Sequence, residues 1–304
     1  MAKLKIGTRG SQLALAQAHE TRARLMKAHG WSEDDVEIII IRTTGDMIRD
    51  RPLAEIGGKG LFTKEIEEAL LDGRIDLAVH SMKDVPAILP GGLLISTYLP
   101  REDNRDAFIS HVAASIDDLP EGAKVGTSSV RRAAQLLARR PDLEITGFRG
   151  NVGTRLDKLA AGEVDATFLA CAGLNRLGLA DRITQAVPPD IMLPAVAQGA
   201  IGIEIRENDA DTRALLDPLD DKDTRTAVAA ERGFLAELEG SCRTPLAAFA
   251  TVEGDTVSLR CEALSLDGRE VWRAARKGQA GEAGEMGREA AREVLAAAGD
   301  RLVL

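Results

Sequence analysis

Short apolar runs and longer amphipathic stretches follow one another along the first two thirds of the chain. The short runs end in glycine or polar turns and predict strands, whereas the amphipathic stretches predict helices. The first pair is a strand at residues 3–8 and a helix at residues 12–29, with Ser11 as N-cap. Further strands are expected at residues 36–41, 75–78, 107–110, 124–127, 143–146, 164–170 and 200–205. This alternation is typical of α/β domains with largely parallel sheets.

The pattern changes near residue 219. A predicted helix there is followed by strand patterns at residues 246–252 and 256–264 and by a last helix around Met286. Polar and proline-rich stretches at residues 100–106 and 188–199 suggest crossings between domains. We therefore predict an α/β protein with two α/β domains flanking a cleft and a small C-terminal α+β domain. The expected domains are residues 1–99 with 200–218, residues 100–199, and residues 219–304.

A long polar segment, residues 42–60, has no clear helix or strand pattern. Segments of this length without secondary structure are usually functional or disordered. We interpret it as a mobile lid, with Lys59 as a candidate anion contact. The helix expected after it places Phe62, Ile66, Ala69 and Leu70 on one face. Phe62 is therefore either a core residue or part of the edge of a site.

Charged side chains follow the strand predicted at residues 75–78. The chain continues as Val79-His80-Ser81-Met82-Lys83-Asp84-Val85-Pro86 and so presents Lys83 beside Asp84. Ligands of open α/β sheets bind beyond the carboxyl ends of strands, where a carboxylate can stabilise a cation or move a proton. The alternative is a plain turn in which Asp84 starts the loop and Lys83 is solvated.

Arginines recur at the other predicted strand ends. They are Arg9, Arg131, Arg132, Arg149, Arg155 and Arg176. Because guanidinium groups bind carboxylates through paired hydrogen bonds, they indicate a ligand that carries carboxylates. The helix after Ser129 is expected to bury a stripe that leaves Arg131 and Arg132 outside it. That stripe is Val130, Ala133, Ala134 and Leu137. Cations in a first turn oppose the helix dipole, and a bound anion would offset this.

Composition narrows the classes of function. The net charge of −9 disfavours general nucleic-acid binding, and no apolar run is long enough to predict a membrane span. The start of the chain lacks the apolar core of a signal peptide, so a cytoplasmic protein is expected. The four histidines are isolated and the three cysteines widely spaced, which indicates neither a metal site nor a disulfide framework.

Two of the cysteines differ in their expected chemistry. Cys171 lies among small apolar residues and is expected to be a buried, inert thiol. Cys242 lies in the segment Gly240-Ser241-Cys242-Arg243-Thr244-Pro245, where the neighbouring cation of Arg243 would favour the thiolate. Two alternatives stay open for Cys242, a reactive thiol and a loop cysteine without function.

Six segments, taken together and in order, resemble the porphobilinogen deaminase family, also called the hydroxymethylbilane synthases. They are Thr8-Arg9-Gly10-Ser11, Gly57-Gly58-Lys59-Gly60-Leu61-Phe62, Val79-His80-Ser81-Met82-Lys83-Asp84-Val85-Pro86, Gly126-Thr127-Ser128-Ser129-Val130-Arg131-Arg132, Arg149-Gly150-Asn151-Val152-Gly153-Thr154-Arg155 and Leu193-Pro194-Ala195-Val196-Ala197-Gln198-Gly199. The resemblance implies two domains like those of type II periplasmic binding proteins, and a third domain with a cofactor cysteine. It implies a transferase of tetrapyrrole and haem biosynthesis that joins four porphobilinogen molecules head to tail, releases ammonia, and frees hydroxymethylbilane by hydrolysis.

The resemblance also implies roles for single residues. Cys242 would hold a covalent dipyrromethane cofactor through a thioether, and Asp84 would be the catalytic carboxylate. The residues implied to bind the cofactor are Ser81, Lys83, Asp84, Thr127, Ser128, Ser129, Arg131, Arg132 and Arg155. Those implied to bind porphobilinogen and the growing linear oligopyrrole are Arg9, Ser11, Lys59, Phe62, Arg149, Arg176 and Gln198. A monomer with no metal, nucleic-acid or membrane partner is expected.

Two positions depart from the family pattern. Glu55 stands where many members carry a basic residue, and Ser241 stands where glycine is common. Glu55 weakens the expectation of two cations in the lid, and Ser241 would restrict the cofactor loop. The rival hypothesis is a non-enzymatic two-domain binder of small carboxylates, which would need neither Asp84 nor Cys242. A thiol enzyme with a Cys–His pair is less favoured, because no histidine lies in a matching motif.

Overall fold

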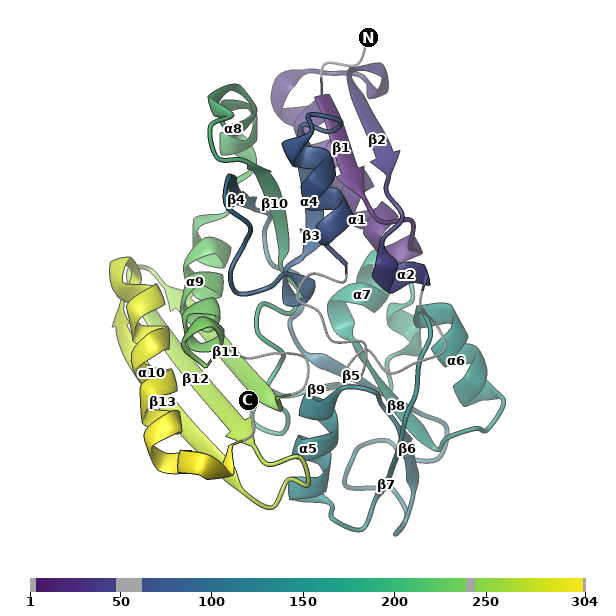
Figure 1. The fold of residues 1–304 in the computed structure, drawn as a ribbon. Helices are drawn as coiled ribbons and strands as arrows, with labels where there is room; N and C mark the ends of the chain where they lie inside the picture. Colours follow the sequence, from purple (N-terminus) through teal and green to yellow (C-terminus); the bar gives the residue numbers. More distant parts are fainter. Residues whose placement is uncertain (1–3, 48–61, 239–243, 303–304) are drawn as a thin grey trace. The chain divides into compact units, whose positions relative to one another are not determined.

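The computed structural model describes residues 4–47, 62–238 and 244–302 (Figure 1). The chain forms two compact units. The first comprises residues 1–102 and 199–225, and the second comprises residues 103–198 and 226–304. The second unit holds both a large sheet and a small C-terminal sheet, so the predicted division into three domains stays a prediction.

The first unit is built on a five-stranded sheet. Its strands are β1 (Leu4–Thr8), β2 (Val36–Ile40), β3 (Leu77–Ser81), β4 (Leu93–Tyr98) and β10 (Ile201–Arg206), in the order β2-β1-β3-β10-β4. β1 runs parallel to β2 and β3, whereas β10 is antiparallel to both of its neighbours. In the described part of this unit the helices are α1 (Gln12–His29), α2 (Thr44–Met47), α4 (Lys64–Leu71) and α8 (Ala210–Leu216).

The two faces of the first sheet bury different helices. Leu77 and Val79 of β3 share a core cluster with Leu25 of α1, whereas Ala78 shares another cluster with Ile66 of α4. This follows from the two-residue period of a strand, which sends successive side chains to opposite faces. The sheet is therefore covered on both faces, as its largely apolar strands predict.

The second unit repeats this arrangement. Its large sheet contains β5 (Asp106–Ser110), β6 (Lys124–Gly126), β7 (Glu144–Thr146), β8 (Ala166–Ala170) and β9 (Gln185–Val187), in the order β7-β6-β8-β5-β9. β6 is parallel to β7 and β8, whereas β5 is antiparallel to both of its neighbours. Its helices are α5 (Val130–Arg139), α6 (Val152–Ala160) and α7 (Cys171–Arg176). In both large sheets the fourth strand is the antiparallel one.

The second unit also contains the C-terminal sheet. Strands β11 (Leu246–Glu253), β12 (Thr256–Leu264) and β13 (Val271–Gln279) form an antiparallel meander beside α9 (Lys222–Glu237) and α10 (Ala283–Ala298). The two helices approach closely at Gly287, where an added Cβ would lie 2.1 Å from the carbonyl oxygen of Ala230. The predicted α/β and α+β fold class is confirmed. The 3₁₀ turns lie at Glu33–Asp35, Met82–Asp84, Ala180–Arg182, Asp217–Leu219, Ala280–Glu282 and Gly299–Arg301.

The structure corrects three sequence predictions. The segment expected to be a loop begins with a helical turn, α2, because Thr44 donates both its backbone N–H and its hydroxyl to Glu65 Oε1. Phe62 precedes α4 instead of lying on it. The prediction of which residues α5 buries was also wrong. Val130, Ala133 and Leu137 are only half-buried, whereas Arg131, Arg132, Gln135 and Leu136 are buried with Ala134.

Candidate functional site

Candidate residues of the first unit follow two adjacent parallel strands. Gly7 of β1 pairs with Ala78 of β3, so the two strands end at the same edge of the sheet. Arg9 follows β1 directly, and Lys83 and Asp84 lie in the 3₁₀ turn that follows β3. The structure therefore brings the charged groups of two predicted motifs to one edge, where ligands of α/β sheets bind.

Arg9 is held beside an aromatic ring. Its guanidinium carbon lies 4.1 Å from the centre of the Phe62 ring, a cation–π contact. The neighbouring Ser11 caps α1 as predicted, since its hydroxyl oxygen accepts the backbone N–H of Ala14 at 3.2 Å. Phe62 is half-buried, which favours the interpretation of this residue as the edge of a site.

The turn after β3 is fixed at one end and open at the other. Ser81 Oγ accepts a hydrogen bond from Nε2 of the buried Gln17 at 2.8 Å and lies 3.0 Å from Gln17 Oε1. The side chains of Lys83 and Asp84 are exposed. A carboxylate held on a short turn and open to solvent can accept hydrogen bonds from a ligand or take part in proton transfer.

Candidate residues of the second unit meet at one edge of its large sheet. The parallel strands β6, β7 and β8 all end there, and they precede Thr127, Gly147 and Cys171 respectively. The antiparallel strand β5 begins at that edge, because Asp106 pairs with Ala170 at the end of β8. One acidic residue is thereby placed among the arginines that follow the parallel strands.

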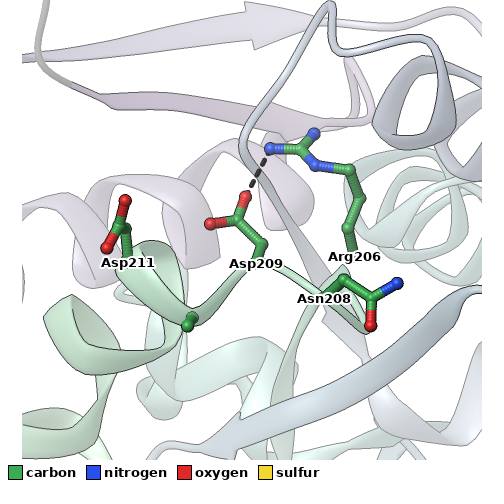
Figure 2. A pocket seen from close by; sticks show the side chains of 5 residues that line it. Arg206, Asn208, Asp209 and Asp211 are labelled. Atoms are coloured by element: carbon green, nitrogen blue, oxygen red, sulfur yellow. Dashed lines mark hydrogen bonds and ion pairs between the residues drawn. The ribbon is translucent and has the colours of Figure 1, made fainter.

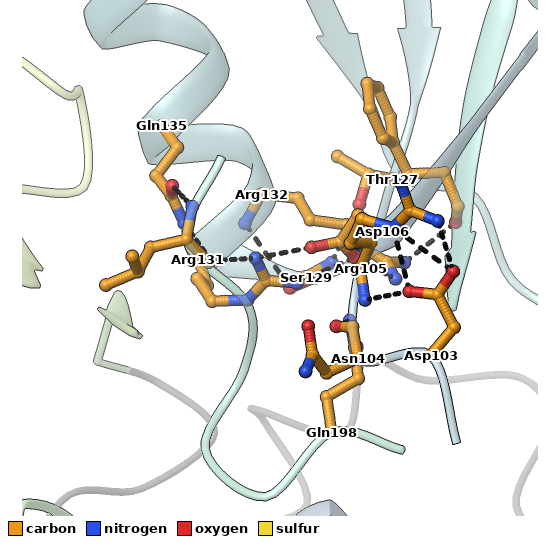
Figure 3. A network of polar contacts seen from close by, with 12 residues as sticks. Asp103, Asn104, Arg105, Asp106, Thr127, Ser129, Arg131, Arg132, Gln135 and Gln198 are labelled. Carbon is orange, nitrogen blue, oxygen red and sulfur yellow. Dashed lines mark hydrogen bonds and ion pairs between the residues drawn. The ribbon is translucent and has the colours of Figure 1, made fainter. Parts of the chain in front are cut away.

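Asp106 lies between the two arginines of the first turn of α5 (Figure 3). Arg131 donates to both carboxylate oxygens, at 2.9 and 3.0 Å, and Arg132 Nε donates to Asp106 Oδ1 at 2.7 Å. Each arginine also donates to one main-chain oxygen, Arg131 to that of Leu193 and Arg132 to that of Phe168, each at 2.7 Å. This network explains why α5 buries its arginines.

The charges of this network do not cancel. Burial alone would raise the pKa of Asp106, but the two guanidiniums outweigh it and hold that pKa at about 2. The one carboxylate of Asp106 pairs with two arginines, and Arg131 Nε is buried without a hydrogen-bond partner among the described residues. Burial together with Arg131 lowers the pKa of Arg132. A ligand with further negative charge would be stabilised here.

A second group of positive charge lies beside this network. Arg155, in the first turn of α6, donates to the carbonyl oxygen of Gly150 at 3.0 Å. Its pKa falls to about 10, because burial and then the positive charges of Arg132 and Arg149 disfavour its charged form. Gly150 adopts a φ of 131°, which side-chain-bearing residues rarely do. The glycine turn thus lets two arginines approach despite their repulsion.

The hydroxyl groups after β6 organise the local main chain. Thr127 Oγ1 accepts the N–H of Ser129 at 3.2 Å, and Ser128 Oγ accepts that of Phe148 at 3.0 Å. Ser129 caps α5, where its hydroxyl oxygen accepts the N–H of Arg132 at 3.4 Å. The predicted role of these hydroxyl groups in binding a cofactor stays a prediction.

The remaining candidates lie in different surroundings. Arg176 is the half-buried last residue of α7. Gln198 is buried, and its amide donates to the carbonyl oxygen of Asn104 at 2.8 Å. Lys59 and Cys242 lie outside the described residues, as do the departures Glu55 and Ser241.

The thiols of Cys171 and Cys261 are buried. The predicted burial of Cys171 is confirmed, and it raises the pKa of this thiol to about 12. Burial raises the pKa of Cys261 as well. Neither thiol is suited to nucleophilic attack, because the thiolate is the reactive form.

Asp106 and Gln17 were missed by the sequence predictions. Asp106 begins a strand, and nothing in its neighbours shows that the strand runs antiparallel and starts at the site edge. Gln17 lies on the buried face of α1 at a position where a polar residue breaks the apolar stripe. That break was the available signal, because buried amides normally have specific hydrogen-bond partners.

A depression of about 340 Å³ lies elsewhere, at the end of β10 (Figure 2). Arg206 and Asp209 line it and pair with each other, with 2.5 Å between Nη2 and Oδ2. The described residues contain no group of three potential metal-ligating side chains. None of the helices in the described part of the chain has the length and hydropathy needed to span a bilayer.

Comparisons with known proteins agree with the motifs. Residues 4–214 match the family model "Porphobilinogen deaminase, dipyromethane cofactor binding domain", and residues 225–296 match "Porphobilinogen deaminase, C-terminal domain". The chain is 60% identical over 291 residues to the porphobilinogen deaminase of Paracoccus denitrificans, covering 96% of this chain and 93% of that relative. It is 55% identical over 296 residues to that of Nitrobacter hamburgensis, covering 97% and 94%. Among solved structures, a periplasmic substrate-binding protein of an ABC transporter from Coxiella burnetii is similar with a TM-score of 0.43 and 16% identity, covering 71% of this chain and 91% of that one.

Proposed function

The chain belongs to the porphobilinogen deaminase family, and on that premise we propose which of its residues bind the cofactor, bind the substrate and transfer protons. The chain is an enzyme, a transferase of tetrapyrrole biosynthesis with a dipyrromethane cofactor. It polymerises porphobilinogen with loss of ammonia and releases hydroxymethylbilane. When bound, the cofactor supplies the pyrrole carbon to which substrate is joined. The proposal concerns the residues that hold this group and act on porphobilinogen.

The residues of the second unit fit a group that carries several carboxylates. The observation that supports this assignment is the excess positive charge around Asp106, together with the unpartnered Nε of Arg131. Arg131, Arg132 and Arg155 would bind carboxylates of the cofactor, with Ser129 beside them. The positive charge of Arg155, disfavoured by its neighbours, would be stabilised by such a ligand. Thr127 and Ser128 would keep the main chain in place around these groups.

Arg149 and Arg176 are assigned to carboxylates of incoming porphobilinogen and of the growing oligopyrrole. Each porphobilinogen carries an acetate and a propionate, so the number of carboxylates rises as the chain lengthens, and more than one guanidinium is needed. Gln198 would lie near the substrate. Lys59 and the attachment residue Cys242 are assigned from the family motif, since both lie outside the described residues.

Asp84 is assigned the acid–base role in the first unit. Its exposed carboxylate would accept hydrogen bonds from pyrrole N–H groups and stabilise the positive charge that develops as ammonia leaves porphobilinogen. Ser81 and Lys83 would contact cofactor carboxylates, and Arg9, Ser11 and Phe62 would contact the substrate. A simple carboxylate-binding protein would gain nothing from Asp84, because its charge repels an anionic ligand.

The intact mass of the denatured protein, followed by peptide mapping, tests the attachment. We expect an excess equal to two porphobilinogen units less two ammonia, located on Cys242. Cys242→Ser should lack this excess, whereas Cys261→Ser, which changes a buried thiol, should keep it. An unmodified protein that gains no mass on incubation with porphobilinogen would contradict the assignment. We further propose a cytoplasmic monomer without nucleic-acid or membrane partners, in keeping with the net charge of −9.

A further inference from the structure

The segment Leu193–Gln198 is fixed at its first residue by two side chains of α5. The main-chain N–H of Leu193 donates to Gln135 Oε1 at 2.7 Å, and its carbonyl oxygen accepts from Gln135 Nε2 at 3.0 Å. The same oxygen accepts from Arg131 at 2.7 Å. Leu193 is thus tied to the network that surrounds Asp106.

The other end of this segment adopts a strained conformation. Ala197 has a φ of 57°, and no other non-glycine residue in the described ranges has a positive φ. The left-handed region is unfavourable for alanine because its Cβ crowds the main chain. The N–H of Ala197 donates to Glu231 Oε2 at 2.6 Å, a short bond to a carboxylate. Glu231 therefore stabilises a turn that the sequence alone disfavours.

Glu231 is fully buried and binds a second segment with its other oxygen. Oε1 accepts the N–H of Ala250 at 2.9 Å. Ala250 lies in β11, an edge strand of the C-terminal sheet. Glu231 itself lies in α9, so its carboxylate joins α9, β11 and the segment that carries Gln198. Residue Cys242 follows α9 and precedes β11 in the sequence.

We propose that Glu231 is a positioning residue for porphobilinogen binding, an inference that rests on the function proposed above. By fixing Ala197 to α9 and β11, the carboxylate sets the position of the next residue, Gln198, whose amide donates to the Asn104 carbonyl. Loss of these bonds should release Gln198 and weaken substrate binding. A displacement of about 1 Å in a positioned group can reduce rates on the order of 100-fold.

Two substitutions of Glu231 remove either both or one of its hydrogen-bond acceptors. Glu231→Met keeps a side chain of similar length without an oxygen, so both N–H groups lose their acceptor. Glu231→Gln keeps one acceptor and places an NH₂ group against the other N–H. We expect KM for porphobilinogen to rise about tenfold in Glu231→Met and less in Glu231→Gln, with a smaller change in kcat. Glu231→Gln keeps the test available if Glu231→Met does not fold.

A second substitution at Ala197 separates positioning from general stability. Glycine adopts a positive φ without the cost that alanine bears. Adding Ala197→Gly to either Glu231 variant should therefore lower KM for porphobilinogen at least threefold relative to the Glu231 variant alone. As a control, Val294→Ala removes two buried methyl groups of α10 in the same unit and should lower the melting temperature while leaving KM within twofold.

The outcomes are distinct. Unchanged KM in both Glu231 variants, or failure of Ala197→Gly to recover it, would overturn the proposal. A rise in KM in Val294→Ala matching that of the Glu231 variants would also overturn it, because instability alone would then explain the effect. Intact mass at Cys242 is measured for every variant, since it reports attachment independently of turnover. A wild-type protein without turnover or mass gain would instead contradict the proposed function.

Discussion

Replacing Asp106 by asparagine tests how the buried arginines of α5 are tolerated. The substitution preserves the size of the side chain and removes the negative charge to which both Arg131 and Arg132 donate. Both guanidinium groups are more than nine-tenths buried, with 6% and 7% of their side-chain surface exposed. Removing one partner of a buried ion pair leaves uncompensated charge and typically costs about 3–5 kcal/mol. We therefore expect a large loss of stability from Asp106→Asn.

The pKa of Asp106 gives an independent value for its contribution to the free energy of unfolding. It lies at about 2, against an ordinary value of 3.8. At 1.36 kcal/mol per unit, this difference corresponds to about 2–3 kcal/mol. Because the folded-state pKa is the lower one, the contribution is fully present above about pH 4 and is lost as the pH falls through 2. Asp106→Asn should thus lower the free energy of unfolding by about 3 kcal/mol near neutral pH, and by much less at pH 2.

Urea unfolding followed by circular dichroism at both pH values measures this difference. Asp117→Asn is the matched control, because Asp117 pairs with Arg139 in the same unit while 54% of its side chain is exposed. An exposed pair of this kind contributes about 0–1 kcal/mol. If Asp106→Asn lost no more stability at neutral pH than Asp117→Asn, the argument that Asp106 compensates two buried cations would be refuted.

Two further predictions concern turnover and packing. Asp84→Asn should keep the melting temperature, because the side chain is exposed. It should lower kcat by about 100-fold or more, as expected for loss of a general acid–base group. Near wild-type turnover in a steady-state assay would remove Asp84 from the mechanism. Gly287→Ala should cost about 1–3 kcal/mol, because its Cβ would lie 2.1 Å from the Ala230 carbonyl oxygen. Gly281→Ala, whose Cβ meets nothing within 4 Å, should be nearly neutral in the same thermal melt.

Local features of the structure could be predicted from the sequence alone. The helix at residues 12–29 and its Ser11 cap were predicted with the bounds that the structure has. Both depend on interactions within a few residues, namely the helical period of apolar side chains and a hydroxyl that accepts a nearby N–H. The ordered motifs were also sufficient to predict the family, because they preserve residue types at successive strand ends. The strand at residues 200–205 was likewise predicted from its apolar run, and the structure has it as β10 of the first sheet.

The surroundings of the arginines depended on contacts distant in sequence. The predicted stripe of α5 was wrong because an apolar period assumes that charged side chains stay in water, whereas Asp106 compensates Arg131 and Arg132 in the core. Asp106 reaches them because β5 runs antiparallel and starts at the edge where its neighbours end. Strand direction depends on how the chain crosses between sheets, and no local pattern encodes it. The positive φ of Ala197 also depends on a distant contact. The N–H of Ala197 donates to Glu231, which lies 34 residues later in the sequence. Periodicity and capping act within a few residues, whereas the compensation of buried charge and strain requires partners that only folding brings together.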